Sequence, residues 1–119
     1  MSTRKIGLAI EQQAQVYLET RGLKWISSNY QCRLGEIDLI MRDGGYLVFV
    51  EVRARSSAAF GGAAASITYG KRQKIIKTAS HYLLSNKLTD KQPVRFDVLS
   101  FEGKTPQVNW IKNAFGLDF

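Results

Sequence analysis

Residues 35–56, GEIDLIMRDGGYLVFVEVRARS, contain two strand-like runs separated by an Asp-Gly-Gly turn. Apolar residues that alternate on both sides of such a turn are typical of a β-hairpin. We predict that one face of this hairpin is buried and is formed by Ile37, Leu39, Met41, Val48, Val50 and Val52. The other face is only half apolar, because Asp38 and Glu51 interrupt it. The two carboxylates on this face pose the question of function.

The turn residues determine how these carboxylates face each other. A two-residue Gly44-Gly45 turn places Asp38 directly opposite Glu51, whereas an Asp43-Gly44 turn makes them diagonal neighbours. In both cases the two residues share a face and lie ~4.5–8 Å apart at the backbone. Like charges opposed across strands destabilise a sheet unless a cation compensates them. The hairpin therefore predicts a compensating positive charge near its acidic end.

The whole chain, residues 1–119, is predicted to form one α/β domain. Helices are predicted at residues 4–21 and 69–86, and further strands at 23–30, 94–101 and 108–112. The small, Gly-rich residues 54–66 are interpreted as a loop that follows the hairpin. A helix, three strands, a helix and two strands indicate a central mixed sheet flanked by helices. Asp97, within the strand 94–101, is expected to form a structural ion pair with a nearby arginine.

Charge and composition indicate the class of partner. The 119 residues include 17 Lys and Arg against 10 Asp and Glu, which gives a formal net charge of +7. A basic excess of this size favours an anionic partner, with nucleic acid ahead of anionic lipid. The single cysteine excludes an internal disulfide and indicates a reducing compartment. No apolar run approaches the ~20 residues that span a bilayer, so we expect a cytoplasmic protein without a membrane partner.

Two kinds of cation could compensate Asp38 and Glu51. In one interpretation Arg53 and other basic side chains form plain ion pairs with them. In the other, a divalent metal binds between them, since carboxylate oxygens suit Mg²⁺ or Mn²⁺. Glu11 lies at the edge of the predicted buried stripe of the first helix, either directed along the core boundary or extended into solvent. The spacing Glu51-Val52-Arg53 places a base beside a carboxylate on one face, a pattern suited to phosphodiester cleavage.

These residues also resemble a known family. The chain contains GEIDLI, followed by a hairpin and FVEVR. It also contains a Gly-Gly-Ala stretch from Gly61, RFDV at 95–98 and WIK at 110–112. The combination is similar, over essentially the whole chain, to the YraN-type family of small bacterial proteins. Members of that family are thought to be endonucleases of the restriction-endonuclease-like PD-(D/E)xK superfamily. The resemblance implies a restriction-endonuclease-like fold and Mg²⁺- or Mn²⁺-dependent hydrolysis of DNA.

The resemblance also implies a role for each matching residue. Asp38 and Glu51 match the two acidic metal ligands, and the backbone carbonyl of Val52 would complete the protein ligands. Glu11 is similar to a glutamate on the N-terminal helix of related nucleases, where it supports the metal directly or through water. Arg53 stands where the superfamily usually has lysine. Because arginine is effectively always protonated, it cannot act as a general base, although it can stabilise phosphorane charge. This departure leaves the enzyme assignment open.

Nucleic-acid contacts are expected from the basic residues around the second helix. The candidates are Arg55, Lys71, Arg72, Gln73 and Lys74. Such a cluster gives affinity for phosphates without sequence preference, and a solvated helix end is the alternative interpretation. The predicted partner is structured or single-stranded DNA, with RNA as an alternative, and a homodimer would be needed to cut both strands. A catalytically silent nucleic-acid-binding protein that retains the nuclease fold is the competing hypothesis.

Overall fold

The computed structural model describes residues 3–55, 67–103 and 107–116, and the side chains of 3–6 and 55 lie outside that description. The elements are α1 (Thr3–Thr20), β1 (Lys24–Cys32), β2 (Gly35–Asp43), β3 (Tyr46–Arg55), α3 (Tyr69–Ser85), β4 (Val94–Glu102) and β5 (Gln107–Phe115). The predicted order of elements is confirmed. The predicted loop 54–66 lies mostly outside the described residues, and β3 extends into its first two positions.

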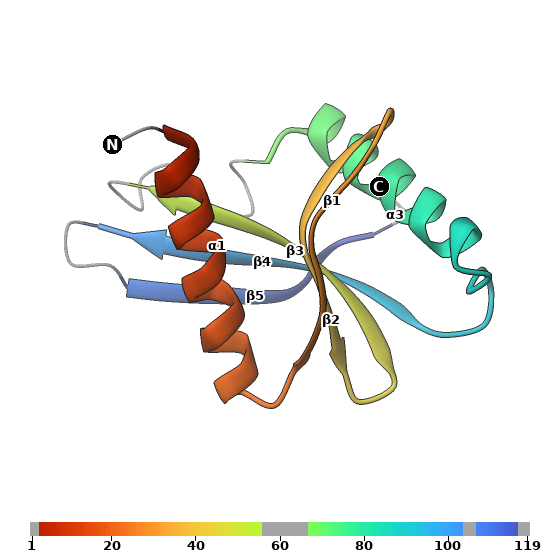
Figure 1. Ribbon diagram of the computed structural model, residues 1–119, viewed down its shortest axis with the longest axis horizontal. Helices are drawn as coiled ribbons and strands as arrows, with labels where there is room; N and C mark the ends of the chain where they lie inside the picture. The colour runs from red at the N-terminus through yellow and green to blue at the C-terminus, as the bar shows by residue number, and fades with distance from the viewer. Residues whose placement is uncertain (1–2, 56–66, 104–106, 117–119) are drawn as a thin grey trace.

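The five strands form one mixed sheet in the order β1-β2-β3-β4-β5. All neighbours pair antiparallel except β3 and β4, which are parallel and are joined through α3. Figure 1 shows α1 across one face of the sheet and α3 against the other. The prediction of an α/β domain with a mixed sheet between helices is therefore confirmed.

Each helix covers its own apolar core. The core under α1 contains Ala14, Leu18, Leu23, Leu39, Met41, Val48, Val50 and Leu99. The core under α3 contains Ile37, Ile40, Leu47, Phe49, Ile67, Ile75, Ile76, Ala79, Phe96, Val98 and Phe115. Both sides of the central strands β2 and β3 are thus buried. This explains why the predicted polar face of the hairpin is half apolar, since Ile40, Leu47 and Phe49 belong to the core under α3.

The ends of both helices follow from local sequence. Gly22, with φ of +96°, ends α1 in a Schellman motif, in which its N–H donates to Glu19 and that of Leu23 donates to Leu18. Leu18 and Leu23 both belong to the core under α1, as expected for the apolar residues that usually accompany this motif. Thr68 caps α3, because its hydroxyl accepts a hydrogen bond from the backbone N–H of Lys71.

The hairpin register is the one produced by the Gly44-Gly45 turn, since Asp43 pairs with Tyr46. The paired residues end at Leu39 and Val50, and the same register continued by one residue would place Asp38 opposite Glu51.

Ile37 departs from the predicted buried face. It was expected on the same face as Leu39, but it packs in the core under α3. The prediction assumed strict alternation along β2. That assumption fails where the pairing with β3 stops, at Leu39, because a strand that leaves its neighbour is free to twist.

The β1–β2 pair separates from β3 beyond this point. In Figure 1 the two orange strands run toward α3, whereas β3 continues beside β4 and β5 past α1. Gly35 permits the close approach of β2 to α3, because a Cβ on this residue would lie 2.9 Å from Thr78 Oγ1. The sheet is therefore forked, and Asp38 lies just beyond the last β2–β3 pair.

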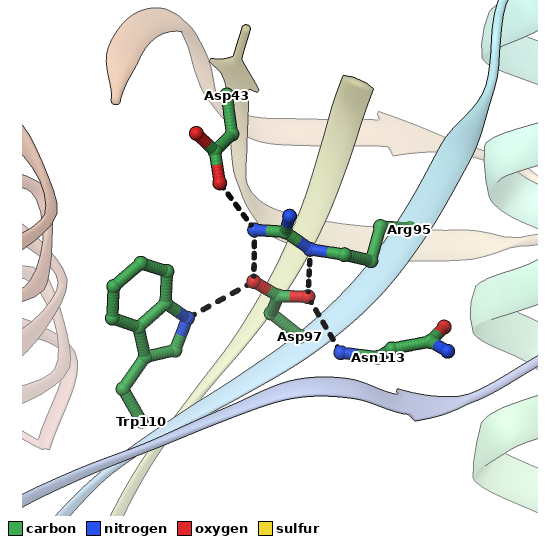
Figure 2. A network of polar contacts seen from close by, with 5 residues as sticks. All are labelled: Asp43, Arg95, Asp97, Trp110 and Asn113. Carbon is green, nitrogen blue, oxygen red and sulfur yellow. Dashed lines mark hydrogen bonds and ion pairs between the residues drawn. The ribbon is translucent and has the colours of Figure 1, made fainter. Parts of the chain in front are cut away.

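A buried polar network fixes the other end of the central strands (Figure 2). Arg95 donates two hydrogen bonds of 2.9 Å to Asp97 and a third, also of 2.9 Å, to Asp43 at the end of β2. Asp97 also accepts from the indole of Trp110 at 2.9 Å and from the backbone N–H of Asn113 at 3.0 Å. The predicted ion pair of Asp97 is confirmed. Because Asp97 is completely buried, this network is a structural tie between β2, β4 and β5.

Candidate functional site

A polar cavity of about 410 Å³ lies at the fork of the sheet. It is bounded by α1, β2, β3 and the start of α3, and its lining residues are Gly7, Ile10, Glu11, Glu36, Asp38, Glu51, Val52, Arg53, Ala54 and Lys71. This one cavity is therefore lined by the four residues that the sequence predicts to form a metal site, Glu11, Asp38, Glu51 and Val52. It is also lined by Arg53, the proposed cation.

Asp38 is held in place by the backbone of the neighbouring strand. Its Oδ2 accepts a hydrogen bond of 2.8 Å from the N–H of Val52. Burial, followed by the negative charge of Glu51, raises the pKa of Asp38 from 3.8 to about 8. The hydrogen bond from Val52 opposes this rise, and the charge of Lys71 opposes it less strongly. Desolvation is therefore the main reason for the raised pKa of Asp38, and the charge of Lys71 offsets only part of it.

Glu11 projects from α1 into the same cavity. Burial raises the pKa of its carboxyl, and the charges of Glu36 and Glu51 raise it further, against hydrogen bonds with Asn29 and Asp38. Its Oε1 atom is buried and has no hydrogen-bond partner among the described residues. Of the two orientations considered for Glu11, the structure has the one directed along the core boundary.

Two cations lie near Glu51, and they come from different elements. The Nζ atom of Lys71, at the start of α3, is 2.9 Å from Glu51 Oε1. The Nη1 atom of Arg53, two residues along β3, is 3.9 Å from the same oxygen. The Glu51 side chain is 7% exposed, so the lysine reaches a largely desolvated carboxylate. The closer cation is thus Lys71.

The predicted basic cluster on α3 does not act as one surface. Lys71 is directed to Glu51, whereas the guanidinium of Arg72 points inward, donating from Nε to the Ile67 carbonyl and lying over the Phe115 ring. Gln73 is half-buried and Lys74 is exposed. The side chain of Arg55 lies outside the described residues.

Sequence reasoning missed the part that Lys71 and Asn29 play in this site. Lys71 was assigned to phosphate contacts because no sequence signal places the start of α3 against β3. Asn29, on β1, forms a hydrogen bond with Glu11 and has a φ of +54°. Its position could not have been found from periodicity, because a left-handed residue in a strand interrupts the alternation.

The model of the Uncharacterised protein family UPF0102 matches residues 10–101. This match includes Glu11, the hairpin with Asp38 and Glu51, and Lys71. The chain belongs to the UPF0102 family. The prediction that the chain belongs to a family of small bacterial proteins is confirmed, and that family is UPF0102.

Several bacterial UPF0102 proteins are similar over nearly the whole chain. A UPF0102 protein of Legionella pneumophila strain Philadelphia 1 is 58% identical over 113 residues, which cover 95% of this chain and 96% of the relative. A UPF0102 protein of Aeromonas hydrophila is 52% identical, covering 92% of this chain and 83% of the relative. One from Serratia proteamaculans is 50% identical, covering 99% and 100%.

In the part of this UPF0102 protein that the structure describes, no group of three or more His, Cys, Asp and Glu side chains is arranged to hold a metal ion. Neither helix in this part is long and apolar enough to cross a membrane.

The raised pKa of Asp38 predicts how stability depends on pH. Because the folded-state pKa lies above the usual 3.8, the folded chain binds more protons than the unfolded chain between about pH 4 and pH 8. Stability should therefore fall as pH rises through this window. Asp38→Asn keeps the acceptor for Val52 N–H but removes the charge, and it should raise the free energy of unfolding at pH 8 by on the order of a few kcal/mol.

Urea unfolding of the wild-type protein and Asp38→Asn at pH 5, 6.5 and 8 measures this effect. The difference between the two proteins should grow with pH. The exposed Asp90, replaced by Asn, serves as the control and should show no comparable trend. A constant difference across the three pH values would contradict a raised pKa of the half-buried Asp38 in the folded protein.

Proposed function

We propose that this protein is an endonuclease of the restriction-endonuclease-like superfamily that hydrolyses phosphodiester bonds of DNA with the help of Mg²⁺ or Mn²⁺. The main support is the convergence of Asp38 and Glu51 in one cavity with two cationic side chains. Acidic groups beside cations in a concave site are suited to bind and polarise a phosphodiester.

The residues of the cavity fit a hard divalent cation. Mg²⁺ usually retains several waters and takes only one or two protein carboxylates, so a site with Asp38 and Glu51 as ligands requires no third acidic residue. The Val52 carbonyl, on the strand beside them, would be the third protein ligand. The raised pKa of Asp38 supports a need for more positive charge here, as does the Oε1 atom of Glu11, which has no hydrogen-bond partner within the described part of the chain. Glu11 is suited to bind a metal-coordinating water.

Each side chain has a defined task in this proposal. The metal ion would supply Lewis-acid polarisation of the scissile phosphate. Asp38, fixed by the Val52 N–H, and Glu51 provide the negative charge that holds the ion. In the hydrolysis, a water oxygen forms a bond to phosphorus as the bond from phosphorus to the leaving oxygen breaks. The water loses a proton to solvent and the leaving oxygen gains one. Arg53 neutralises charge on the phosphoryl oxygens and takes no proton.

Structured or single-stranded DNA is the proposed substrate, with RNA as an alternative. The net charge of +7 favours phosphate binding without sequence preference. Lys74, exposed on α3, remains suited to contact the backbone outside the cavity. One chain contributes one acidic pair, so cutting both strands of a duplex would require a homodimer or two successive encounters.

End-labelled branched, flapped, single-stranded and duplex DNAs, incubated with protein in Mg²⁺, Mn²⁺ or EDTA, test this proposal. We expect cleavage of at least one substrate in a divalent metal and none in EDTA. The Asp38→Asn protein should lose the activity, which excludes a contaminating nuclease. Absence of cleavage of every DNA and of matching RNAs, in both metals, would contradict the proposal.

A silent nucleic-acid-binding protein is the second candidate, and the Lys71–Glu51 ion pair favours it. If a lysine already compensates the acidic pair, Asp38 and Glu51 could serve structure alone. This candidate predicts DNA binding that is indifferent to Mg²⁺ and unchanged in Asp38→Asn. Fluorescence anisotropy distinguishes the two candidates. Phosphate contacts give a steep salt dependence in either case, and Mg²⁺ weakens such contacts by competing for the phosphates. Only a metal site makes DNA binding tighter when Mg²⁺ is added.

A further inference from the structure

Lys71 reaches the candidate site from a different element than the motif residues. Its Nζ atom lies 2.9 Å from Glu51 Oε1, whereas the nearest Arg53 nitrogen lies 3.9 Å away. The Lys71 side chain is 46% exposed and that of Arg53 is 28% exposed. Lys71 therefore contacts the buried carboxylate at its tip and keeps access to the open side of the cavity.

The position of Lys71 on its helix is unfavourable for a lysine. It is the third residue after the cap Thr68, where Glu or Gln would complete a capping box. Positive side chains in the first helical turn also oppose the helix dipole. The first turn of α3 contains no acidic residue that could offset this cost. The compensating contact is the ion pair with Glu51, so the cation at this position serves the cavity and not the helix.

We infer that Lys71 is the catalytic cation of this site, supplied from α3 in the place of the lysine that the strand motif lacks. The inference rests on the proposed function and adds a residue to it. Arg53 becomes an auxiliary phosphate contact. A lysine ammonium is a compact, mobile point charge, and it can leave Glu51 for a phosphoryl oxygen more readily than a planar guanidinium fixed on a strand.

The chemical task of Lys71 is electrostatic. As the water oxygen bonds to phosphorus and the leaving oxygen departs, negative charge grows on the phosphoryl oxygens, and the Lys71 ammonium lies within reach of that charge. Lys71 stays protonated throughout, so the proton balance with solvent is unchanged. Removal of one such preorganised cation typically lowers kcat about 10²–10³-fold.

Single-turnover cleavage by Lys71→Met, Lys71→Arg and Arg53→Met tests the inference on whichever DNA the wild-type protein cuts. Lys71→Met should lose about a hundredfold or more in rate at saturating protein, with DNA affinity changed only severalfold. Lys71→Arg should recover part of the rate because it keeps the charge. Arg53→Met should lose less than Lys71→Met. Lys77→Met, an exposed lysine of the same helix, is the matched control.

Mn²⁺ binding, followed by calorimetry without DNA, gives a second readout. Lys71→Met should bind Mn²⁺ severalfold more tightly, because no ammonium competes for Glu51, and Lys77→Met should bind as wild type does. Full cleavage by Lys71→Met, or a loss confined to DNA affinity, would overturn the inference while leaving the nuclease proposal intact. Failure of the wild-type protein to cut any substrate would overturn both.

Discussion

Asp97→Asn is expected to lower the free energy of unfolding by about 3–5 kcal/mol, the largest stability effect that this structure predicts. The Asp97 carboxylate is completely buried and accepts four hydrogen bonds: two from Arg95, one from Trp110 and one from the Asn113 backbone. An amide at this position turns one acceptor into a donor that faces other donors. The substitution also removes one of the two carboxylates that form ion pairs with Arg95, so that of this pair Asp43 remains.

Chemical denaturation at pH 7 measures the effect, with Asp90→Asn as a control that makes the same change at an exposed turn position. The control should change stability by less than about 0.5 kcal/mol. A loss below about 1 kcal/mol in Asp97→Asn would show that the network in Figure 2 is not the tie between strands that its geometry indicates.

Glu51→Gln is expected to lower the cleavage rate by at least about a hundredfold, with little change in stability. The substitution removes a negative charge that the proposal assigns to the metal ion. It also removes the like charge that helps to raise the pKa of Asp38, which offsets the lost ion pair with the half-exposed Lys71. Thermal unfolding should therefore stay close to that of the wild-type protein.

Initial cleavage rates and melting curves, measured on the same preparations, separate the two effects. Glu19→Gln, an exposed position on α1, makes the same chemical change away from the cavity and should alter neither rate nor melting. A Glu51→Gln protein that cuts at the wild-type rate would exclude this carboxylate from the chemistry.

Much of the fold could be predicted because its signals are local. The Asp-Gly-Gly turn, the period of the apolar residues and Gly22 after α1 each act over a few residues, and the structure confirms the elements they predict. The strands are longer than predicted at several ends. For example, β5 continues to Phe115 and not Lys112, because a register shift beside Asp97 accommodates Asn113 with a φ of +53°.

The arrangement of the site was only partly predictable. The strand register expected from the turn residues predicted that Asp38 and Glu51 lie at one end of the hairpin. Helical periodicity predicted that Glu11 lies at the core boundary. The fork of the sheet was not predictable, because strand alternation does not report where two strands part. Ile37 was assigned to the wrong face for this reason. The contact of Lys71 with Glu51 depends on how α3 packs, which is a property of the tertiary structure.

A crystal soaked in Mn²⁺ tests the central claim most directly, because anomalous scattering locates the ion without reference to activity. We expect a peak between the carboxylates of Asp38 and Glu51, within coordination distance of both, with the Lys71 ammonium displaced from Glu51. A cavity that shows no anomalous peak at saturating Mn²⁺, with Lys71 still paired to Glu51, would contradict it. In that case the protein's own lysine is the cation that the two carboxylates require.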